Sequence, residues 1–238
     1  MGTGELSVDE RGLAVGGAHR CDDRGKPDVG SAARGAKGEL NVVRIAIVTG
    51  STRPGRNNLA VAAWVYRVAQ ERKDAEFDLV DIADYDLPLL DEPNPPMLGQ
   101  YTHEHTRSWS KRIMSFDAYV FVTPEYNHST SGALKNAIDY LYREWQNKAA
   151  GFVSYGGHGN GVRAVEHLRL VMAEVMIATV RAQVALSFFT DFEGFRRFKP
   201  SPQRESEVHT MLDQVIAWGS ALKTVREPQS TQELQVSS

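Results

Sequence analysis

Apolar residues in the middle of the chain follow two alternating patterns. Short continuous apolar runs of strand length recur five times, and between them apolar residues return at helical spacing. The runs cover residues 42–49, 77–82, 118–123, 151–155 and, roughly, 177–188. Several are apolar at successive rather than alternate positions, as in AYVFVT, which is typical of a strand covered on both faces. The pattern therefore predicts buried strands that alternate with helices.

The helical segments begin near Leu59, Leu134 and Val162, and a last helix is predicted from about Gln203 to Val225. Five strands joined by helices imply right-handed crossovers, which build a parallel sheet with helices on both faces. We therefore predict a doubly wound α/β domain.

Three loops rich in small and polar residues follow the first, third and fourth predicted strands. Their sequences are GSTRPGRNN, PEYNHSTSG and GGHGNG. In open α/β sheets a ligand lies beyond the carboxyl ends of the strands, where the strand order reverses. With a strand order of 2-1-3-4-5 the first two loops flank this point and the third lies beside them, so that one site could use all three.

The first loop is suited to an anion but departs from two known nucleotide-binding motifs. Gly50 and Gly55 match the glycines of a Walker A loop, whereas Arg56 and Asn57 replace its Lys and Ser or Thr, so NTP hydrolysis is disfavoured. The TGxxxGxG pattern of short-chain dehydrogenases fails as well, because Pro54 and Arg56 stand where it has glycine.

A terminal monophosphate fits this loop better, because backbone N–H groups at a helix N-terminus bind phosphate. Side-chain donors would come from Ser51, Thr52 and Asn58, and charge-assisted hydrogen bonds from Arg53 and Arg56. The alternative is a polar strand-to-helix turn in which Asn57 or Asn58 caps the helix and the arginines are solvated.

The second loop brings a tyrosine and an asparagine to the end of a strand. Tyr126 could pack against a flat ring, while Asn127 and backbone amides could bond to the ring's edge. The simpler interpretation is a strand exit at which Thr130 or Ser131 caps the next helix. Glu125, taken alone, is interpreted as a solvated carboxylate.

The third loop has glycines at a spacing that resembles a dinucleotide fingerprint. Gly159, Gly161 and Ala164 give GxGxxA, but they start several residues after the strand, and no convincing ribose-binding acid follows. We favour a second interpretation, in which the glycines of SYGG let the backbone approach a ring closely.

Other candidate sites are weaker. The HEH segment at His103 to His105 lacks a third ligand at metal spacing, so solvated histidines that open a helix are favoured and no metal site is predicted. Asp81, Asp84, Asp86 and Asp91 are interpreted as surface charge. With no G-x-S-x-G turn and no reactive cysteine setting, the sequence offers no hydrolase nucleophile.

Composition narrows the possible partners. With 238 residues, 42% hydrophobic and 24% charged, the chain is typical of one globular domain. A net charge of -3 and a pI near 6.2 give no broad basic surface for nucleic acid or an anionic membrane. No apolar stretch approaches the roughly 18 residues of a membrane span, and no signal-peptide core is apparent. The lone Cys21 forms no internal disulfide, so we expect a cytoplasmic location.

Two segments outside the apolar pattern are expected to be tails. Residues 1–40 carry few large apolar groups and are predicted to be disordered, as are residues 226–238, which leaves a domain at 41–225. An incorrectly assigned start or a cloning remnant would account equally well for the first 40 residues.

Taken together, GSTRPGR, TPEYNHSTSGALKNAIDYL and SYGGHGNGVRAVEHLR resemble the NADPH-dependent FMN reductase family, the flavodoxin-like group that includes chromate, azo and quinone reductases. The likeness extends from about Val43 to Val225, and PEYN followed by GALKNAIDYL is its most specific part. Departures occur at Asn57 and Asn58, where the family often has smaller or hydroxyl residues, and at His128 and Thr130.

The resemblance implies a five-stranded flavodoxin-like sheet of order 2-1-3-4-5 that binds FMN. It implies a ping-pong reaction with NADPH or NADH, in which the flavin carries the chemistry, no catalytic side chain is needed, and the acceptor is a quinone, azo compound, metal oxyanion or free flavin. A homodimer or homotetramer is expected. The implied phosphate ligands are Ser51, Thr52, Arg53, Arg56, Asn57 and Asn58, and the implied ring contacts are Pro124, Glu125, Tyr126, Asn127, Ser154, Tyr155, Gly156 and Gly157.

Two other functions remain open at this stage. A flavodoxin-like electron carrier would hold FMN but react poorly with NAD(P)H, although such carriers are usually more acidic than this chain. A flavodoxin-like binding module that has lost turnover is the third possibility, and the presence of all three loops weighs against it.

Overall fold

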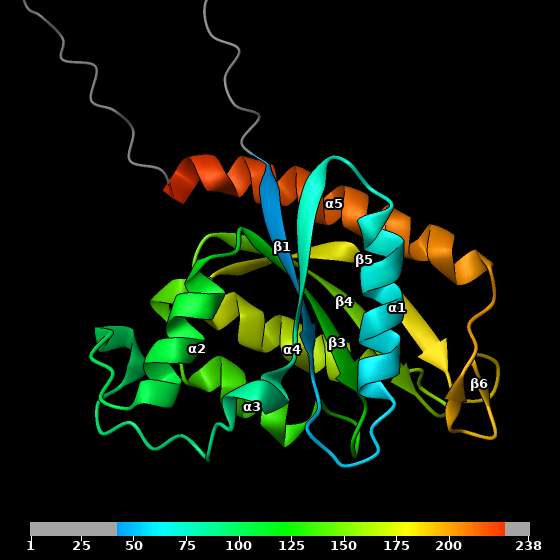
Figure 1. The fold of residues 1–238 in the computed structure, drawn as a ribbon, viewed down its shortest axis with the longest axis horizontal. Coiled ribbons are helices and arrows are strands. Elements are labelled where there is room, and N and C mark those ends of the chain that lie inside the picture. The colour runs from blue at the N-terminus through cyan, green and yellow to red at the C-terminus, as the bar shows by residue number, and fades with distance from the viewer. Residues whose placement is uncertain (1–41, 227–238) are drawn as a thin grey trace, which may run out of the picture. The chain divides into compact units, whose positions relative to one another are not determined.

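A computed structural model describes residues 42–226 of the chain, so both predicted tails, apart from Arg226, lie outside the described part. Its central feature is a parallel sheet of five strands in the order β2-β1-β3-β4-β5, which confirms the predicted doubly wound topology (Figure 1). The strands are β1 (Val43–Thr49), β2 (Ala75–Val80), β3 (Ala118–Pro124), β4 (Lys148–Gly156) and β5 (Ile177–Ser187).

Helices cover both faces of this sheet. The α-helices are α1 (Asn58–Gln70), α2 (Glu104–Met114), α3 (Gly132–Asp139), α4 (Val162–Glu174) and α5 (Gln203–Arg226), and the short 3-10 helices are η1 (Ile82–Tyr85), η2 (Pro96–Leu98) and η3 (Arg143–Trp145). One hydrophobic core joins the sheet to α1 and α5, and a second joins its other face to α2, α3 and α4.

Neighbouring residues of one strand enter different cores. Ile45 and Ile47 belong to the core under α1, while Ala46 and Val48 belong to the opposite core. Every residue of β3 and β4 is buried, which explains why these strands are apolar at successive positions.

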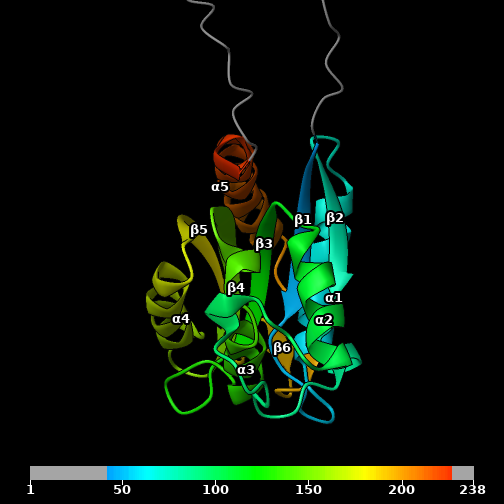
Figure 2. The same ribbon diagram turned by 90° about the vertical axis from the view of Figure 1, so that its left-hand side faces the viewer.

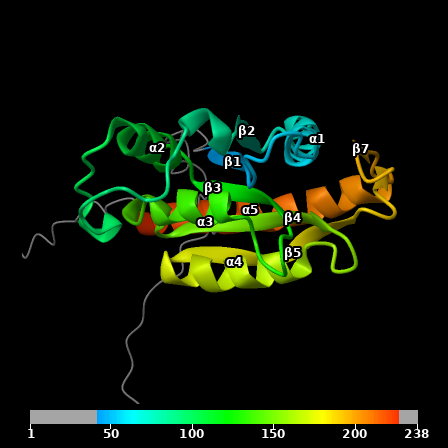
Figure 3. The same ribbon diagram turned by 90° about the horizontal axis from the view of Figure 1, so that it is seen from below.

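The carboxyl ends of the five strands lie at the lower edge of the sheet in Figures 1 and 2, and Figure 3 views this edge from below. The three loops that follow β1, β3 and β4 meet there. No helix within residues 42–226 has both the length and the apolar character needed to cross a membrane.

A small antiparallel hairpin of β6 (Phe192–Glu193) and β7 (Arg197–Phe198) was not predicted from the sequence. Two-residue strands are too short to show a hydrophobic period, so only the density of phenylalanines in FFTDFEGFRRF marks this segment. The hairpin follows β5 and therefore adds a fourth segment to the carboxyl edge of the sheet.

Candidate functional site

The first loop starts at a glycine that touches the neighbouring strand. A Cβ atom added to Gly50 would overlap the carbonyl oxygen of Val122 in β3, so only glycine fits without a backbone shift. Gly55 has a positive φ of 67°, which allows the turn before α1. These two glycines therefore determine where the loop leaves the sheet and where it turns into the helix.

Asn58 holds the first loop from inside. Its amide oxygen accepts from the backbone N–H of Gly50 (2.9 Å), and its amide nitrogen donates to the carbonyl of Val122 (2.8 Å). The side chain has no exposed surface. Asn58 thus ties the loop to β3, and its position favours support of the loop over direct contact with a phosphate.

Three other predicted residues lie where the first and second loops meet. The hydroxyls of Ser51 and Tyr126 are 3.1 Å apart, and the guanidinium of Arg53 lies 5.9 Å from the centre of the Tyr126 ring. Arg53 and Thr52 are exposed. The loops that the sequence placed on one edge are therefore in direct contact, with an arginine and a hydroxyl facing outward.

Arg56 is turned inward and pairs with Asp81, which also accepts from the Thr49 hydroxyl (2.7 Å) and the Ala83 N–H (3.1 Å). The interpretation of Asp81 as surface charge is wrong, because its side chain is largely buried in this network. The buried Nε of Arg56 has no hydrogen-bond partner among residues 42–226. A buried donor without a partner points to a missing acceptor near the loop.

Asn57 is the residue before α1, as one of the two capping alternatives had it, but its side chain caps no backbone N–H of the helix. Instead it donates to the carbonyl of Phe195 in the β6-β7 hairpin (3.1 Å). The N–H groups of the first turn of α1 are therefore not satisfied by this side chain and remain suited to an anion.

The second loop contains a tight turn. The backbone groups of Tyr126 and Ser129 exchange two hydrogen bonds (2.8 and 3.0 Å), and the two residues between them, Asn127 and His128, have positive φ angles of 49° and 68°. Left-handed conformations are unusual for residues other than glycine and concentrate at functional sites. Asn127 and His128 are exposed at the tip of this turn.

Ser131 confirms the predicted helix cap. Its hydroxyl accepts from the Leu134 N–H at the start of α3 (3.0 Å) and donates to the carbonyl of Gly50. The same side chain therefore caps α3 and connects the second loop to the first.

Glu125 is not the solvated carboxylate that the sequence suggested. Its side chain is 7% exposed and pairs with Arg163, whose Nε donates at 2.7 Å and whose backbone N–H donates at 3.2 Å. Arg163 belongs to the first turn of α4, so this pair connects the second loop to the third.

In the third loop, Gly161 allows α4 to pack closely against β4. It has a φ of 81°, and an added Cβ would lie 2.5 Å from the Ser154 Cβ. Gly157, in contrast, has no atom within 4 Å of an added Cβ. Open space beside Gly157 is the geometry that close approach to a ring requires.

The side chains of Ser154 and Tyr155 are buried behind the loops. The hydroxyl of Ser154 donates to the carbonyl of Asn160 (2.9 Å), and Tyr155 packs against Phe188 and Phe192. Burial raises the pKa of Tyr155, which keeps its phenol neutral. Pro124 is also buried, as the last residue of β3. These three residues shape the site, and any contact of theirs with a ligand is limited to the backbone.

A group of aromatic side chains at this edge was not predicted from the sequence. We call Phe189, Phe195 and His158 the aromatic ledge: Phe189 lies 5.2 Å from His158 and 5.6 Å from Phe195 between ring centres. Phe189 and Phe195 are 55% and 57% exposed. Five phenylalanines within the eleven residues 188–198 were the available signal, although a core-forming segment would look the same.

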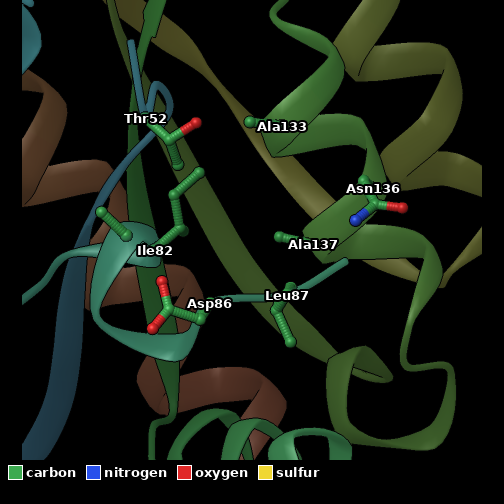
Figure 4. Close-up of a pocket in the computed structure, with 8 residues that line it drawn as sticks. Thr52, Ile82, Asp86, Leu87, Ala133, Asn136 and Ala137 are labelled. Atoms are coloured by element: carbon green, nitrogen blue, oxygen red, sulfur yellow. The ribbon is translucent and has the colours of Figure 1, made fainter. Parts of the chain in front are cut away.

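A pocket of about 340 Å³ lies on the β2 side of the first loop. Figure 4 shows Thr52 and Ile82 on one side of it, Ala133, Asn136 and Ala137 of α3 on the other, and Asp86 and Leu87 below. Among the predicted site residues it contains Thr52 alone. The pocket is therefore next to the three-loop site but does not include the tyrosine turn or the third loop.

The three loops together suit a phosphate linked to a planar ring. At one end of the combined site lie the hydrogen-bond donors of the first loop and of the start of α1, which suit a phosphate. At its other end, the tyrosine turn provides an aromatic surface and Gly157 an open backbone surface, which suit a planar ring. Within residues 42–226 no group of three or more His, Cys, Asp or Glu side chains is arranged to hold a metal ion.

Comparison with known proteins places this geometry in a family. The sequence profile described as NADPH-dependent FMN reductase matches residues 43–191, from β1 to the start of the hairpin. An NAD(P)H-dependent FMN reductase of a Nectria species is 37% identical over 159 residues, which cover 63% of this chain and 79% of that protein. One of Schizosaccharomyces pombe is 42% identical over 120 residues, which cover 50% of this chain and 60% of that protein.

Solved structures agree on the fold. The flavoenzyme FerB, an NAD(P)H:(acceptor) oxidoreductase from Paracoccus denitrificans, aligns with a TM-score of 0.61 at 21% identity and covers 76% of this chain and 98% of its own. At this identity the likeness concerns the fold alone.

Proposed function

The chain belongs to the NADPH-dependent FMN reductase family, and from this premise we propose that it is an FMN-dependent NAD(P)H oxidoreductase. The observation that carries the proposal is the meeting of the three family loops at one edge of the sheet, with Ser51 in contact with Tyr126 and Glu125 in contact with Arg163. The chemistry, transfer of a hydride, is what FMN supplies when it is bound. The residues of the chain would bind the flavin and the nucleotide and orient them toward each other.

We assign the phosphate of FMN to the first loop and the start of α1. The exposed Arg53 and Thr52 and the N–H groups of the first helical turn would donate directly. The buried Nε of Arg56, which has no partner within residues 42–226, would be a further donor of the same loop. Ser51 contributes through its contact with Tyr126, while Asn57 and Asn58 support the loop. This division separates the predicted ligands into direct contacts and supports.

The flavin ring is assigned to the space between the tyrosine turn and Gly157. Tyr126 would lie against the ring, and backbone N–H groups near Asn127 and Gly157 would reach its polar edge. Glu125, Pro124, Ser154, Tyr155 and Gly156 hold these two loops in place from behind. That the flavin carries the chemistry and no catalytic side chain is needed stays a prediction from the family resemblance.

The acceptor stays a prediction: a quinone, an azo compound, a metal oxyanion or free flavin. A flavodoxin-like electron carrier is not favoured, because the similar proteins of Nectria and Schizosaccharomyces pombe are named as reductases. A cytoplasmic location also stays a prediction that rests on the lone Cys21.

A homodimer or homotetramer is part of the proposal. Leu89, Leu90, Met97 and Leu98 lie on the segment between η1 and α2 and are 41–85% exposed. A group of exposed apolar side chains of this kind is typical of an interaction surface. Light scattering coupled to gel filtration would measure the mass, and a monomer at micromolar concentration would contradict this part of the proposal.

Anaerobic stopped-flow absorbance near 450 nm tests the proposed reaction directly. FMN-reconstituted protein is mixed with NADPH and, separately, with NADH, and a quinone is added afterwards. Rapid loss of the flavin absorbance, reversed by the quinone, is the expected result. Bound flavin that neither nucleotide reduces would contradict the enzyme and favour the carrier, and protein that takes up no FMN would exclude both.

A further inference from the structure

The aromatic ledge lies between the first and third loops. The carbonyl of Phe195 accepts a hydrogen bond from Asn57 at the start of α1 (3.1 Å), and the ring of His158 in the third loop contacts Phe189. Figure 1 shows the hairpin beside the lower end of α1, where that helix begins. The ledge therefore borders the proposed flavin site without being part of the three loops that form it.

Phe195 is exposed at the turn of the hairpin, and its backbone there has an unfavourable conformation. Gly194 and Phe195 have φ angles of 56° and 61°, and the Arg196 N–H closes the turn onto the carbonyl of Glu193 (3.2 Å). A left-handed conformation is readily adopted by glycine but is a marked outlier for a bulky aromatic residue. Strain of this kind persists where the surrounding structure enforces it, and it concentrates at functional sites.

The base of the hairpin is rigid. Asp191 is buried and accepts two hydrogen bonds from the guanidinium of Arg204 on α5 (both 3.1 Å) and one from the Ser187 N–H (2.9 Å). Phe198 packs edge to face on Trp64 of α1 with ring centres 5.4 Å apart. The exposed rings are thus presented by a fixed support, as a binding surface requires.

The hairpin also presents a cation. Arg197 and Lys199 both pair with Glu193, at 3.5 and 2.5 Å, so their charges are partly compensated. Arg196, next to Phe195, is exposed and has no carboxylate at ion-pair distance among residues 42–226. An uncompensated arginine adjacent to exposed aromatic rings matches a ligand with both a planar ring and an anionic group.

We infer that the aromatic ledge and Arg196 bind the adenosine 2′-phosphate part of NADPH. Adenine would stack on the phenylalanine rings, and the guanidinium of Arg196 would pair with the 2′-phosphate in bidentate fashion. An uncharged aromatic acceptor would use the rings but would leave the arginine without a role. The inference rests on the proposed function and adds to it the site that distinguishes NADPH from NADH.

The test uses two variants and the fragment 2′,5′-ADP. Arg196→Gln removes the cation, and Phe195→Gly removes the ring at a position whose φ suits glycine. Titration calorimetry of the FMN-loaded protein measures the Kd of 2′,5′-ADP and of AMP, and steady-state assays give KM for NADPH and NADH. The matched control is Arg197→Gln, which makes the same charge change on the same hairpin at an arginine that is already paired.

We expect Arg196→Gln to raise the Kd of 2′,5′-ADP and the KM for NADPH about tenfold or more, because the variant loses a charge-assisted pair with the 2′-phosphate. The KM for NADH, which has no 2′-phosphate, should stay unchanged. Phe195→Gly should raise KM for both nucleotides. Arg197→Gln should change each value less than about threefold.

The inference is overturned if the wild-type protein does not bind 2′,5′-ADP, or if Arg196→Gln and Arg197→Gln change the Kd of 2′,5′-ADP and the KM for NADPH equally. It is also overturned if Phe195→Gly weakens the binding of FMN. In all three outcomes the wild-type protein still takes up FMN and is reduced by a nicotinamide nucleotide. They are therefore distinguishable from failure of the proposed function, in which the wild-type protein would not take up FMN or would not be reduced by either nucleotide.

Discussion

Single side chains in this site differ in whether they face the proposed ligand or support the loop that does. Asn58 and Arg53 are eight and three residues from Gly50 in the sequence, yet Asn58 is fully buried with both ends of its side-chain amide hydrogen-bonded, and Arg53 is exposed beside Tyr126. A substitution at Asn58 should therefore lower the stability of the fold, whereas one at Arg53 should weaken flavin binding.

Replacing Asn58 should destabilise the fold. Asn58→Ala removes both hydrogen bonds of the side-chain amide, so the Gly50 N–H and the Val122 carbonyl lose these partners in a buried environment. We therefore expect the free energy of unfolding to fall by about 2–4 kcal/mol. Urea unfolding of the flavin-free protein measures it. Asn57→Ala, which loses one hydrogen bond at the surface, is the control and should change stability by less than about 1 kcal/mol.

Replacing Arg53 should weaken flavin binding with no change in stability. If Arg53 binds the phosphate as proposed, Arg53→Gln removes charge-assisted hydrogen bonds to it, and we expect the Kd for FMN to rise about 10- to 100-fold. Quenching of flavin fluorescence measures this Kd. Arg107→Gln, an exposed arginine of α2, should leave it unchanged. Equal affinities of wild type and Arg53→Gln would show that the phosphate lies elsewhere.

At the scale of elements, the geometry of the site depends on how closely the loops and helix ends approach the sheet. Gly50 lies against β3, Gly161 lies against β4, and Ser131 joins the start of α3 to the first loop. Each contact brings the N-terminal end of a helix to the carboxyl edge of the sheet. Helix positions and loop shapes are thus determined by the same few small residues.

A substitution at Gly161 would test the close approach of α4 to β4. Gly161→Ala would place a Cβ 2.5 Å from Ser154 and 2.8 Å from the Tyr155 nitrogen at a φ of 81°, so we expect a loss of about 2–4 kcal/mol in the free energy of unfolding. Thermal and urea unfolding measure it. The control is Gly132→Ala at the start of α3, whose Cβ would have no atom within 4 Å and should cost less than about 1 kcal/mol. Equal losses would contradict the packing role.

At the scale of the whole molecule, the two edges of the sheet differ in what they contain. The carboxyl edge holds the proposed site, whereas Lys148, the first residue of β4, is buried near the opposite edge. Its ammonium donates to the carbonyls of Ile113 and Met114 and to the Tyr119 hydroxyl at 3.0–3.3 Å. Burial, followed by the nearby charge of Arg226, lowers the pKa of Lys148 to about 7.

This lowered pKa predicts a pH dependence of stability. Between about pH 7 and 10.5 the unfolded chain keeps a proton on Lys148 that the folded chain has released, so the free energy of unfolding should rise with pH across this window. Because one pKa unit corresponds to about 1.4 kcal/mol, the rise amounts to a few kcal/mol at most.

Urea unfolding of wild type and Lys148→Met between pH 7 and 10 measures this effect. The variant should show a smaller rise with pH, while Lys135→Met, at an exposed lysine of α3, should keep the wild-type slope. A rise of equal size in wild type and Lys148→Met would contradict a role for this lysine.

The sequence by itself determined the parallel sheet, its strand order through the family resemblance, the three loops at one edge and the Ser131 cap. These features follow from local patterns: apolar periodicity, the preferences of turn and cap residues, and motifs within a few positions of one another.

Only the tertiary structure decided which side chain meets which. Val122, Arg163 and Asp81, which bond to Asn58, Glu125 and Arg56, lie 64, 38 and 25 residues away from them, so no local pattern identifies these pairs. For the same reason the aromatic ledge became visible only in the fold, where exposure separates Phe189 and Phe195 from the buried Phe192 of the same segment. Burial and long-range contact are properties of the packed chain, because each depends on residues that the folding of the sheet brings together.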